Sequence, residues 1–195
     1  MYKRVTLRDT VEVPPEDLGD VTPDLVRRLL QDKLEGQMDE EVGSVVSVIE
    51  VHDVGEGAVL PNEPGVYYEA EFDAITFDPQ MQEVVDGSVV EVVEFGAFIG
   101  IGPIDGLLHV SQISDEYLSF DGENQQLASR ESARTLGVDD AVRARIVTKS
   151  IDERNPRESK IGLTGKQVGL GKHGWLQEER EKRQSQQEQE QEAAE

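Results

Sequence analysis

The spacing of hydrophobic residues changes along the first part of the chain. Val5 and Leu7 alternate with polar residues, which indicates a half-buried strand, and Pro14-Pro15 ends it. The apolar residues that follow recur at the spacing of one helix face. They are Leu25, Val26, Leu29, Leu30 and Leu34. A strand followed by a helix is therefore predicted.

The predicted helix has recognisable ends. Thr22 supplies an N-cap hydroxyl, Pro23 suits the first helical position, and Asp24 places a negative charge in the first turn. Gly36 follows the last periodic residue, as is typical of a helix C-terminus.

Residues 42–54 and 66–77 predict two long strands, because the first stretch is rich in β-branched residues and the second alternates apolar and polar positions. An exposed turn region rich in glycine and proline separates them. Its members include Gly55, Glu56, Gly57, Pro61, Asn62, Pro64 and Gly65. The order strand, helix, strand, strand predicts an α+β domain over residues 1–80, with an antiparallel sheet covered by one helix.

Residues 81–164 predict an all-β domain. The expected strands lie in residues 87–101, which hold two of them, and in residues 106–111, 138–151 and 159–163. The first two strands are predicted to fold about Gly96-Ala97. Residues 115–136 are polar and predict a loop with a short helix. Five short strands with one long interruption predict a closed barrel of the OB type.

Residues 165–195 form a C-terminal extension. Gly165, Gly169, Gly171 and Gly174 predict a flexible stretch. Residues 184–195 (QSQQEQEQEAAE) contain too little apolar surface to offset the entropy of ordering, so they are expected to be disordered or a frayed helix.

Composition limits the chemistry that this chain can perform. The chain has no cysteine, which excludes disulfides and thiolate metal sites and fits a reducing, cytoplasmic location. The apolar runs are too short for a membrane span. His52, His109 and His173 stand in no metal-binding spacing, and the motifs of serine nucleophiles and phosphate loops are missing. We expect no catalytic residue, no metal and no cofactor on this chain.

The net charge is −22, with 19 basic and 41 acidic residues. Two interpretations are open: an acidic surface that keeps the protein soluble in strong salt, or an acidic surface that binds a partner. Few lysines and an aromatic content of 5% favour the first, a halophilic protein. In molar salt the Debye length is about 3 Å, so the net charge does not exclude an RNA partner.

Three flat side chains of the predicted barrel are candidates for RNA binding. Phe95 and Phe98 flank the expected turn, so their rings would lie on adjacent strands and share one face, and His109 ends the next strand. Stacking contributes about 1–3 kcal/mol per base and does not require charge attraction. The alternative is that both phenylalanines belong to the core.

Basic residues concentrate near the end of the predicted barrel. Between residues 143 and 172 there are eight bases and three acids. The bases are Arg143, Arg145, Lys149, Arg154, Arg157, Lys160, Lys166 and Lys172. Arg143, Arg145, Lys149 and Lys160 are expected on strands, where a basic stripe beside aromatic rings would suit single-stranded RNA. The alternatives are a solvated strand face and a patch that meets an acidic partner.

Residues 87–113 resemble the S1-like RNA-binding OB domain, most closely in Phe95-Gly96-Ala97-Phe98 and in the run GLLHVS that contains His109. The resemblance implies that Phe95, Phe98 and His109 face RNA. It also implies that polar residues of the last strand join them, for which Asp152 and Lys160 are the candidates.

Residues 1–180 resemble a more specific family, the archaeal RNA polymerase stalk subunits called E-prime, which are similar to the seventh subunit of eukaryotic RNA polymerase II. The strings that carry the resemblance are MYKRVTLRDTVEVPP, KLEGQ, GEGAVLPN, YYEAEFDAITFDP, VRARIV and GLGK. The resemblance implies an N-terminal domain that docks on the RNA polymerase core clamp and a barrel that meets nascent single-stranded RNA. It implies a heterodimer with the smaller RNA polymerase stalk subunit. The docking residues it suggests are Gly55, Glu56, Gly57, Pro61 and Pro64.

Three alternatives stay open beside this non-catalytic subunit. One is a free-standing S1-like RNA-binding factor in translation or RNA decay. Another is a structural stalk protein whose barrel binds only protein. An enzyme comes last, because nothing in the sequence locates its active site.

Overall fold

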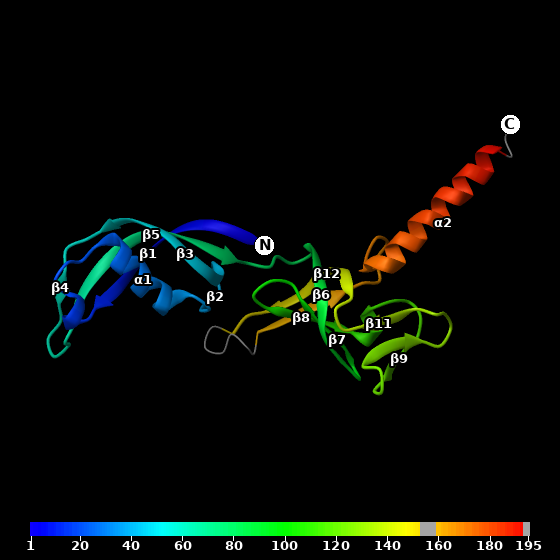
Figure 1. Cartoon of the computed structure of the whole chain (residues 1–195), viewed down its shortest axis with the longest axis horizontal. Coiled ribbons are helices and arrows are strands. Elements are labelled where there is room, and N and C mark those ends of the chain that lie inside the picture. The colour runs from blue at the N-terminus through cyan, green and yellow to red at the C-terminus, as the bar shows by residue number, and fades with distance from the viewer. Residues whose placement is uncertain (153–158, 193–195) are drawn as a thin grey trace. The chain divides into compact units, whose positions relative to one another are not determined.

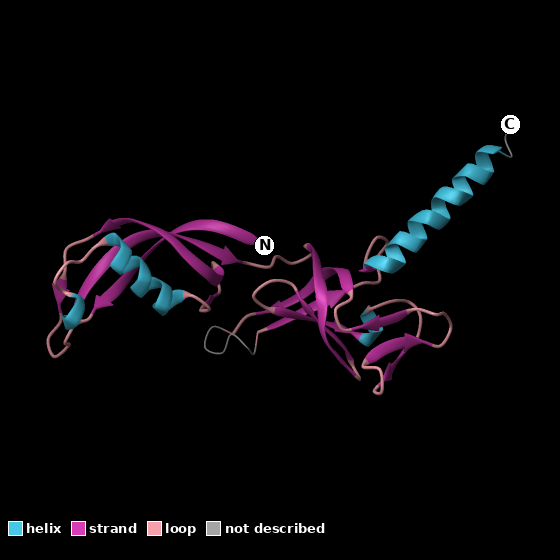
Figure 2. Ribbon diagram, in the orientation of Figure 1, coloured by secondary structure: helices cyan, strands magenta, loops and turns pink. Residues whose placement is uncertain are grey.

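The computed structural model describes residues 1–152 and 159–192, with the side chains of the last helix described as far as residue 187 (Figures 1 and 2). The chain divides into two compact units, of which the first contains Met1–Pro79 and the second contains Gln80–Ser150 and the residues from Ser159 onward.

The N-terminal unit is an antiparallel sheet with one helix, as the hydrophobic pattern predicts. Its long strands are β1 (Tyr2–Val13), β3 (Gly43–Val54) and β5 (Val66–Phe77), and its short strands are β2 (Met38–Asp39) and β4 (Ala58–Val59). The order is β1-β5-β3-β2, and β4 also pairs with β5, so β5 lies at the centre. The sequence does not predict the two-residue strands, because two residues are too few to show an alternation.

Helix α1 (Pro23–Leu34) begins and ends where the sequence indicates. The Thr22 hydroxyl oxygen accepts a hydrogen bond from the backbone N–H of Leu25 at 3.3 Å. Gly36 has φ +82°, a left-handed conformation that glycine adopts without strain. A short 3-10 helix, η1 (Pro15–Asp17), follows β1.

One face of the sheet is apolar and the other is charged. Val26 and Leu30 of α1 pack with Phe72 in a cluster of fully buried side chains. Asp73 follows Phe72 in β5 and therefore lies on the opposite face. The Thr6 hydroxyl and the Arg4 guanidinium donate to its carboxylate, which lowers the pKa of Asp73 to about 2.

The second unit contains a closed barrel of five strands. They are β6 (Val84–Val93), β7 (Gly96–Gly100), β8 (Asp105–His109), β12 (Ala141–Ser150) and β13 (Lys160–Thr164). The order is β13-β8-β7-β6-β12, and pairing of β12 with β13 closes the barrel. Only the β8–β13 pair is parallel among these strands. The predicted OB-type barrel is confirmed.

The hairpin between β6 and β7 turns earlier than predicted. The turn is formed by Glu94 and Phe95, and Gly96-Ala97 already belongs to β7. Strand β8 ends at His109, and the chain then enters a 3-10 helix, η2 (Val110–Gln112).

Residues 115–136 do not form the predicted loop with a short helix. They contain most of a three-stranded antiparallel sheet made of β9 (Leu118–Asp121), β10 (Gln126–Ser129) and β11 (Thr135–Gly137). Each strand buries one leucine, Leu118, Leu127 or Leu136. One apolar residue per strand is too sparse to show a period of two, so the pattern does not reveal the sheet.

The C-terminal extension is more ordered than predicted. Strand β14 (Gly171–Lys172) pairs with β12, and helix α2 (His173–Glu192) follows directly. Trp175 and Leu176 are buried in its first turns. Of the two forms expected for residues 184–195, the structure describes a helix as far as Glu192, and residues 193–195 lie outside the described part. No helix among the described residues is long and apolar enough to cross a membrane.

Candidate nucleic-acid interface

Strands β7 and β8 place two of the candidate side chains on the outer face of the barrel. Phe98 stands between Ala97 and Ile99, which are both fully buried, so its side chain points outward. His109 pairs with Gly96, and Leu107 pairs with Phe98. Because paired residues share a face, Phe98 and His109 are diagonal neighbours on the outer surface.

Phe95 lies in the turn that precedes β7, and not on a strand as predicted. Its side chain is 49% exposed. The ring centroids of Phe95 and Phe98 are 6.4 Å apart and their planes meet at 85°. The two rings therefore meet edge to face. The alternative that both phenylalanines belong to the core is wrong, because Phe95 is exposed and Phe98 is only half-buried.

The His109 imidazole is held by the start of η2. Its Nδ1 accepts a hydrogen bond from the backbone N–H of Ser111 at 3.2 Å and lies 2.8 Å from the Ser111 hydroxyl. Because Nδ1 accepts from the backbone, the neutral ring carries its proton on Nε2. His109 thus offers a flat exposed ring and one N–H donor, which is what an unpaired base can use. We name the group of Phe95, Phe98 and His109 the aromatic face.

Gly96 permits the close approach of β7 and β8 on which this face depends. A Cβ at this position would lie 2.4 Å from the carbonyl oxygen of Leu108 and 2.9 Å from the Cα of His109. Both are backbone atoms, so neither can rotate away.

We predict that Gly96→Ala separates β7 from β8 and destabilises the barrel by about 1–3 kcal/mol or more, the usual cost of overpacking. Urea denaturation of the full chain measures this loss. Gly122→Ala is the matched control, because its Cβ would meet only the Phe120 ring at 3.4 Å. Equal stability of the Gly96→Ala variant and the natural protein contradicts this role for Gly96.

Arg143 and Arg145 lie on the outer face of β12, in period two as predicted, but both have protein partners. Arg143 forms two hydrogen bonds with the Asp86 carboxylate at 2.8 and 2.9 Å. Arg145 donates to the Gln167 side chain at 2.7 Å and to the Gln82 carbonyl at 2.8 Å. Arg143, followed by His173 at 3.0 Å, lowers the pKa of Asp86 to about 2.

Arg143, the first residue of the predicted basic stripe, does not border the aromatic face. On β6, Glu91 pairs with Phe98, whereas Asp86 pairs with Arg143. Five residues of strand correspond to about 16 Å, so this arginine and the phenylalanine lie toward opposite ends of β6. The sequence does not reveal this separation, because it depends on the register between β6 and β12.

The other predicted bases are spread around the barrel. Lys160 is exposed and begins β13, the strand that pairs with β8. Lys149 is half-buried on β12, and Asp152 follows that strand. Lys172 donates to the Asp140 carboxylate at 2.7 Å. Arg154 and Arg157 lie outside the described residues.

The turn region between β3 and β5 forms the tip of the N-terminal unit. The suggested docking residues Gly55, Glu56, Gly57, Pro61 and Pro64 are all exposed there. The tip also exposes two large apolar side chains, Val59 (74%) and Leu60 (44%). Both residues lie inside the stretch 55–64 that the resemblance connects with clamp contact, although they are not among the five docking residues it suggests.

Among the residues that the structure describes, no group of three or more histidine, cysteine or acidic side chains could hold a metal ion.

Family models match both units of the chain. Residues 8–65 match the SHS2 domain found in the N terminus of Rpb7p/Rpc25p/MJ0397, and residues 78–160 match the S1 RNA binding domain.

Relatives match over nearly the full length. DNA-directed RNA polymerase subunit Rpo7 of Sulfolobus acidocaldarius is 33% identical over 92% of this chain and 97% of its own. The protein of the same name from Saccharolobus solfataricus is 34% identical over 90% of this chain and 97% of its own. Among solved structures, apo RNase R of Mycoplasma genitalium matches 43% of this chain and 13% of its own, with 23% identity and a TM-score of 0.36.

Proposed function

The chain belongs to the Rpo7 family of DNA-directed RNA polymerase subunits, and from that premise we propose that it docks on the polymerase core clamp and binds nascent RNA as the RNA leaves the enzyme. The observation that carries the RNA-binding half of this proposal is the aromatic face. Phe95, Phe98 and His109 lie together on a domain of the S1 type, where Phe95 and His109 are exposed and the half-buried Phe98 points outward.

The N-terminal unit is the docking part in this proposal. Its tip exposes Val59 and Leu60 within the turn region that the resemblance connects with clamp contact. Exposed apolar side chains that lie next to each other can mark a protein interaction surface. The smaller stalk subunit is the proposed partner in a heterodimer, and catalysis is left to other subunits.

The charge distribution predicts a weak dependence of RNA affinity on salt. Arg143 is already paired with Asp86, and Arg145 donates to Gln82 and Gln167, so either arginine would have to give up a protein partner to bind a phosphate. Each phosphate contact with single-stranded RNA contributes about −0.7 to the slope of log affinity against log salt. With about two contacts we predict a slope of about −1 to −2 in KCl for the purified chain, measured by fluorescence anisotropy.

A basic RNA-binding protein of similar size provides the comparison in the same buffers. A slope of about −4 or steeper in KCl means that about six or more phosphates are bound, and it contradicts a stacking-dominated site.

Membership of the assembly is tested by affinity purification of the tagged full chain from cell lysate, followed by mass spectrometry. The proposal predicts core polymerase subunits and a smaller partner protein in stoichiometric amounts. Recovery of ribosomes or nucleases without polymerase favours the free-standing RNA-binding factor and contradicts the proposal.

A further inference from the structure

A groove beside the aromatic face has no role in the function proposed so far. It has a volume of about 420 Å³ and begins at Glu94 in the β6–β7 turn and at Val110 and Ser111 of η2. These residues adjoin Phe95 and His109 in the chain, and the N–H of Val110 donates to the carbonyl of Phe95 at 2.8 Å. The volume falls within the roughly 300–1,000 Å³ typical of ligand sites.

The far side of the groove presents an exposed aromatic ring. Tyr117 is 66% exposed, and the Arg130 guanidinium lies 5.9 Å from its ring centroid. The next residue, Leu118, is buried and fixes the backbone. The preceding residue, Glu116, accepts hydrogen bonds from the hydroxyls of Ser129 at 2.6 Å and Ser132 at 2.5 Å. These bonds lower the pKa of Glu116.

The backbone of Tyr117 is therefore held by its neighbours on both sides, while its ring stays exposed. A single exposed apolar residue needs no explanation, but this one is positioned by a small folded sheet and lines a groove. An exposed ring on an anchored backbone is the kind of side chain on which an unpaired base stacks.

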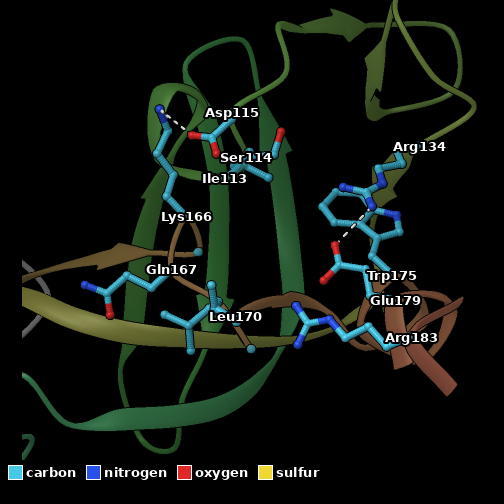
Figure 3. Close-up of a pocket in the computed structure, with 13 residues that line it drawn as sticks. Ile113, Ser114, Asp115, Arg134, Lys166, Gln167, Leu170, Trp175, Glu179 and Arg183 are labelled. Carbon is cyan, nitrogen blue, oxygen red and sulfur yellow. Dashed lines mark hydrogen bonds and ion pairs between the residues drawn. The ribbon is translucent and has the colours of Figure 1, made fainter. Parts of the chain in front are cut away.

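The groove continues into a second hollow that is lined by basic side chains. Ser114, Asp115 and Lys166 line both cavities, and Lys166 lies 3.6 Å from Asp115. Figure 3 shows the second hollow, of about 200 Å³, with Lys166 on one side and Arg183 of α2 on the other. Arg183 thus brings a second cation to the same hollow from a different element of the fold.

Most carboxylates of the groove and the second hollow have a basic side chain nearby. Arg134 pairs with Glu179 at 3.2 Å and with Glu116 at 3.8 Å, and its guanidinium lies 5.4 Å from the Trp175 ring centroid. Lys166 lies 3.6 Å from Asp115 in an exposed contact that is longer than the 2.8 Å bond of Arg143 to Asp86, so its ammonium group is held less tightly than the Arg143 guanidinium. The net charge of the chain is −22, but most carboxylates of the groove and the second hollow lie beside basic side chains. A phosphate backbone would therefore meet little repulsion there.

We infer that the groove is a second RNA subsite, in which Tyr117 stacks a base and Lys166 and Arg183 bind phosphates of the same strand. The inference rests on the proposed function, because it extends the strand that the aromatic face binds. A single-stranded RNA is favoured as the occupant because the groove starts at the aromatic face and combines an exposed ring with basic side chains. A basic peptide is the competing occupant, since Glu94 adds a negative charge at the entrance.

The test compares the affinities of the full chain for a short and a long single-stranded RNA, of about 4 and about 16 nucleotides, the range of site sizes of OB folds. Tyr117→Ala is expected to weaken binding of the long RNA at least about fivefold and to leave the short RNA unchanged. Tyr117→Phe keeps the ring and is the matched control. Lys166→Gln is expected to make the salt slope for the long RNA shallower by about 0.7.

Glu94→Gln separates the two occupants. Removing this charge is expected to raise affinity for the long RNA by up to about fivefold at low salt. If the groove binds a basic peptide, Tyr117→Ala leaves RNA affinity unchanged and reduces recovery of polymerase subunits, which overturns the inference.

Two further outcomes have separate meanings. Unchanged binding of both RNAs by Tyr117→Ala, together with loss of binding in Phe95→Ala/Phe98→Ala, overturns the second subsite and leaves the proposed function intact. Unchanged binding in both variants overturns the aromatic face itself, and with it the inference.

Discussion

Replacing both phenylalanines of the aromatic face, in the variant Phe95→Ala/Phe98→Ala, is expected to lower the affinity of the purified chain for single-stranded RNA at least about thirtyfold. If each ring stacks one base, the pair contributes about 2–6 kcal/mol, and the lower value corresponds to that factor. The affinity is measured by fluorescence anisotropy with a labelled unstructured RNA. Phe95 is exposed and Phe98 half-buried, so the barrel is expected to remain folded.

The single variants sharpen this prediction. The two rings lie edge to face with their centroids 6.4 Å apart, so removal of either one also removes a packing partner of the other. We therefore expect the effects of Phe95→Ala and Phe98→Ala to be non-additive. Tyr2→Ala is the matched control, because it removes a ring that is 55% exposed on the N-terminal unit. A double variant that binds RNA as tightly as the Tyr2→Ala control contradicts stacking.

The second large effect is expected at Phe72, in the centre of the N-terminal unit. Phe72 is fully buried on β5 among Val26 and Leu30 of the helix. Phe72→Ala removes this ring and leaves a cavity, which typically costs about 3–5 kcal/mol. Whole domains are stable by about 5–15 kcal/mol, so the loss is a large share of the unit's stability. Hydrogen exchange of the amides between β1 and β5 measures the change.

Val59→Ala is the control for Phe72→Ala, since Val59 is 74% exposed and its truncation is expected to change stability by no more than about 0.5 kcal/mol. The pair also tests the proposed docking role. Phe72→Ala is expected to reduce the recovery of polymerase because the unit is destabilised, whereas any reduction in Val59→Ala reports a contact at the tip. Unchanged exchange rates in Phe72→Ala contradict the assigned core.

The long elements of the fold are predictable because their hydrophobic patterns span many residues. Strand β5 has the predicted bounds, residues 66–77, and the Thr22 cap marks the start of α1 where the sequence indicates. The sheet of β9, β10 and β11 is not predictable in this way, because each strand buries only one leucine. An element is therefore easier to identify from the sequence when more of its apolar residues repeat at the spacing of a helix or a strand.

The candidate site is predictable only in its residue types. The sequence indicates a turn at Gly96, whereas this glycine serves the close contact of β7 with β8 next to His109. The sequence indicates Arg143 as a contact for RNA phosphates, whereas in the structure its guanidinium pairs with Asp86, 57 positions earlier in the chain. Pairing over such a distance depends on strand register, which one sequence does not show. The ring of Tyr117 likewise acquires its neighbours only from the folded insertion.

The most direct test of the central claim is crosslinking of nascent RNA in the assembled polymerase. A transcript with a photoreactive nucleotide, stalled as it leaves the enzyme, is expected to crosslink to this chain when the natural protein or the Tyr2→Ala control is present. With Phe95→Ala/Phe98→Ala the crosslink should fall to a small fraction, while the polymerase stays intact. An undiminished crosslink with the double variant contradicts the claim that the aromatic face binds the emerging transcript.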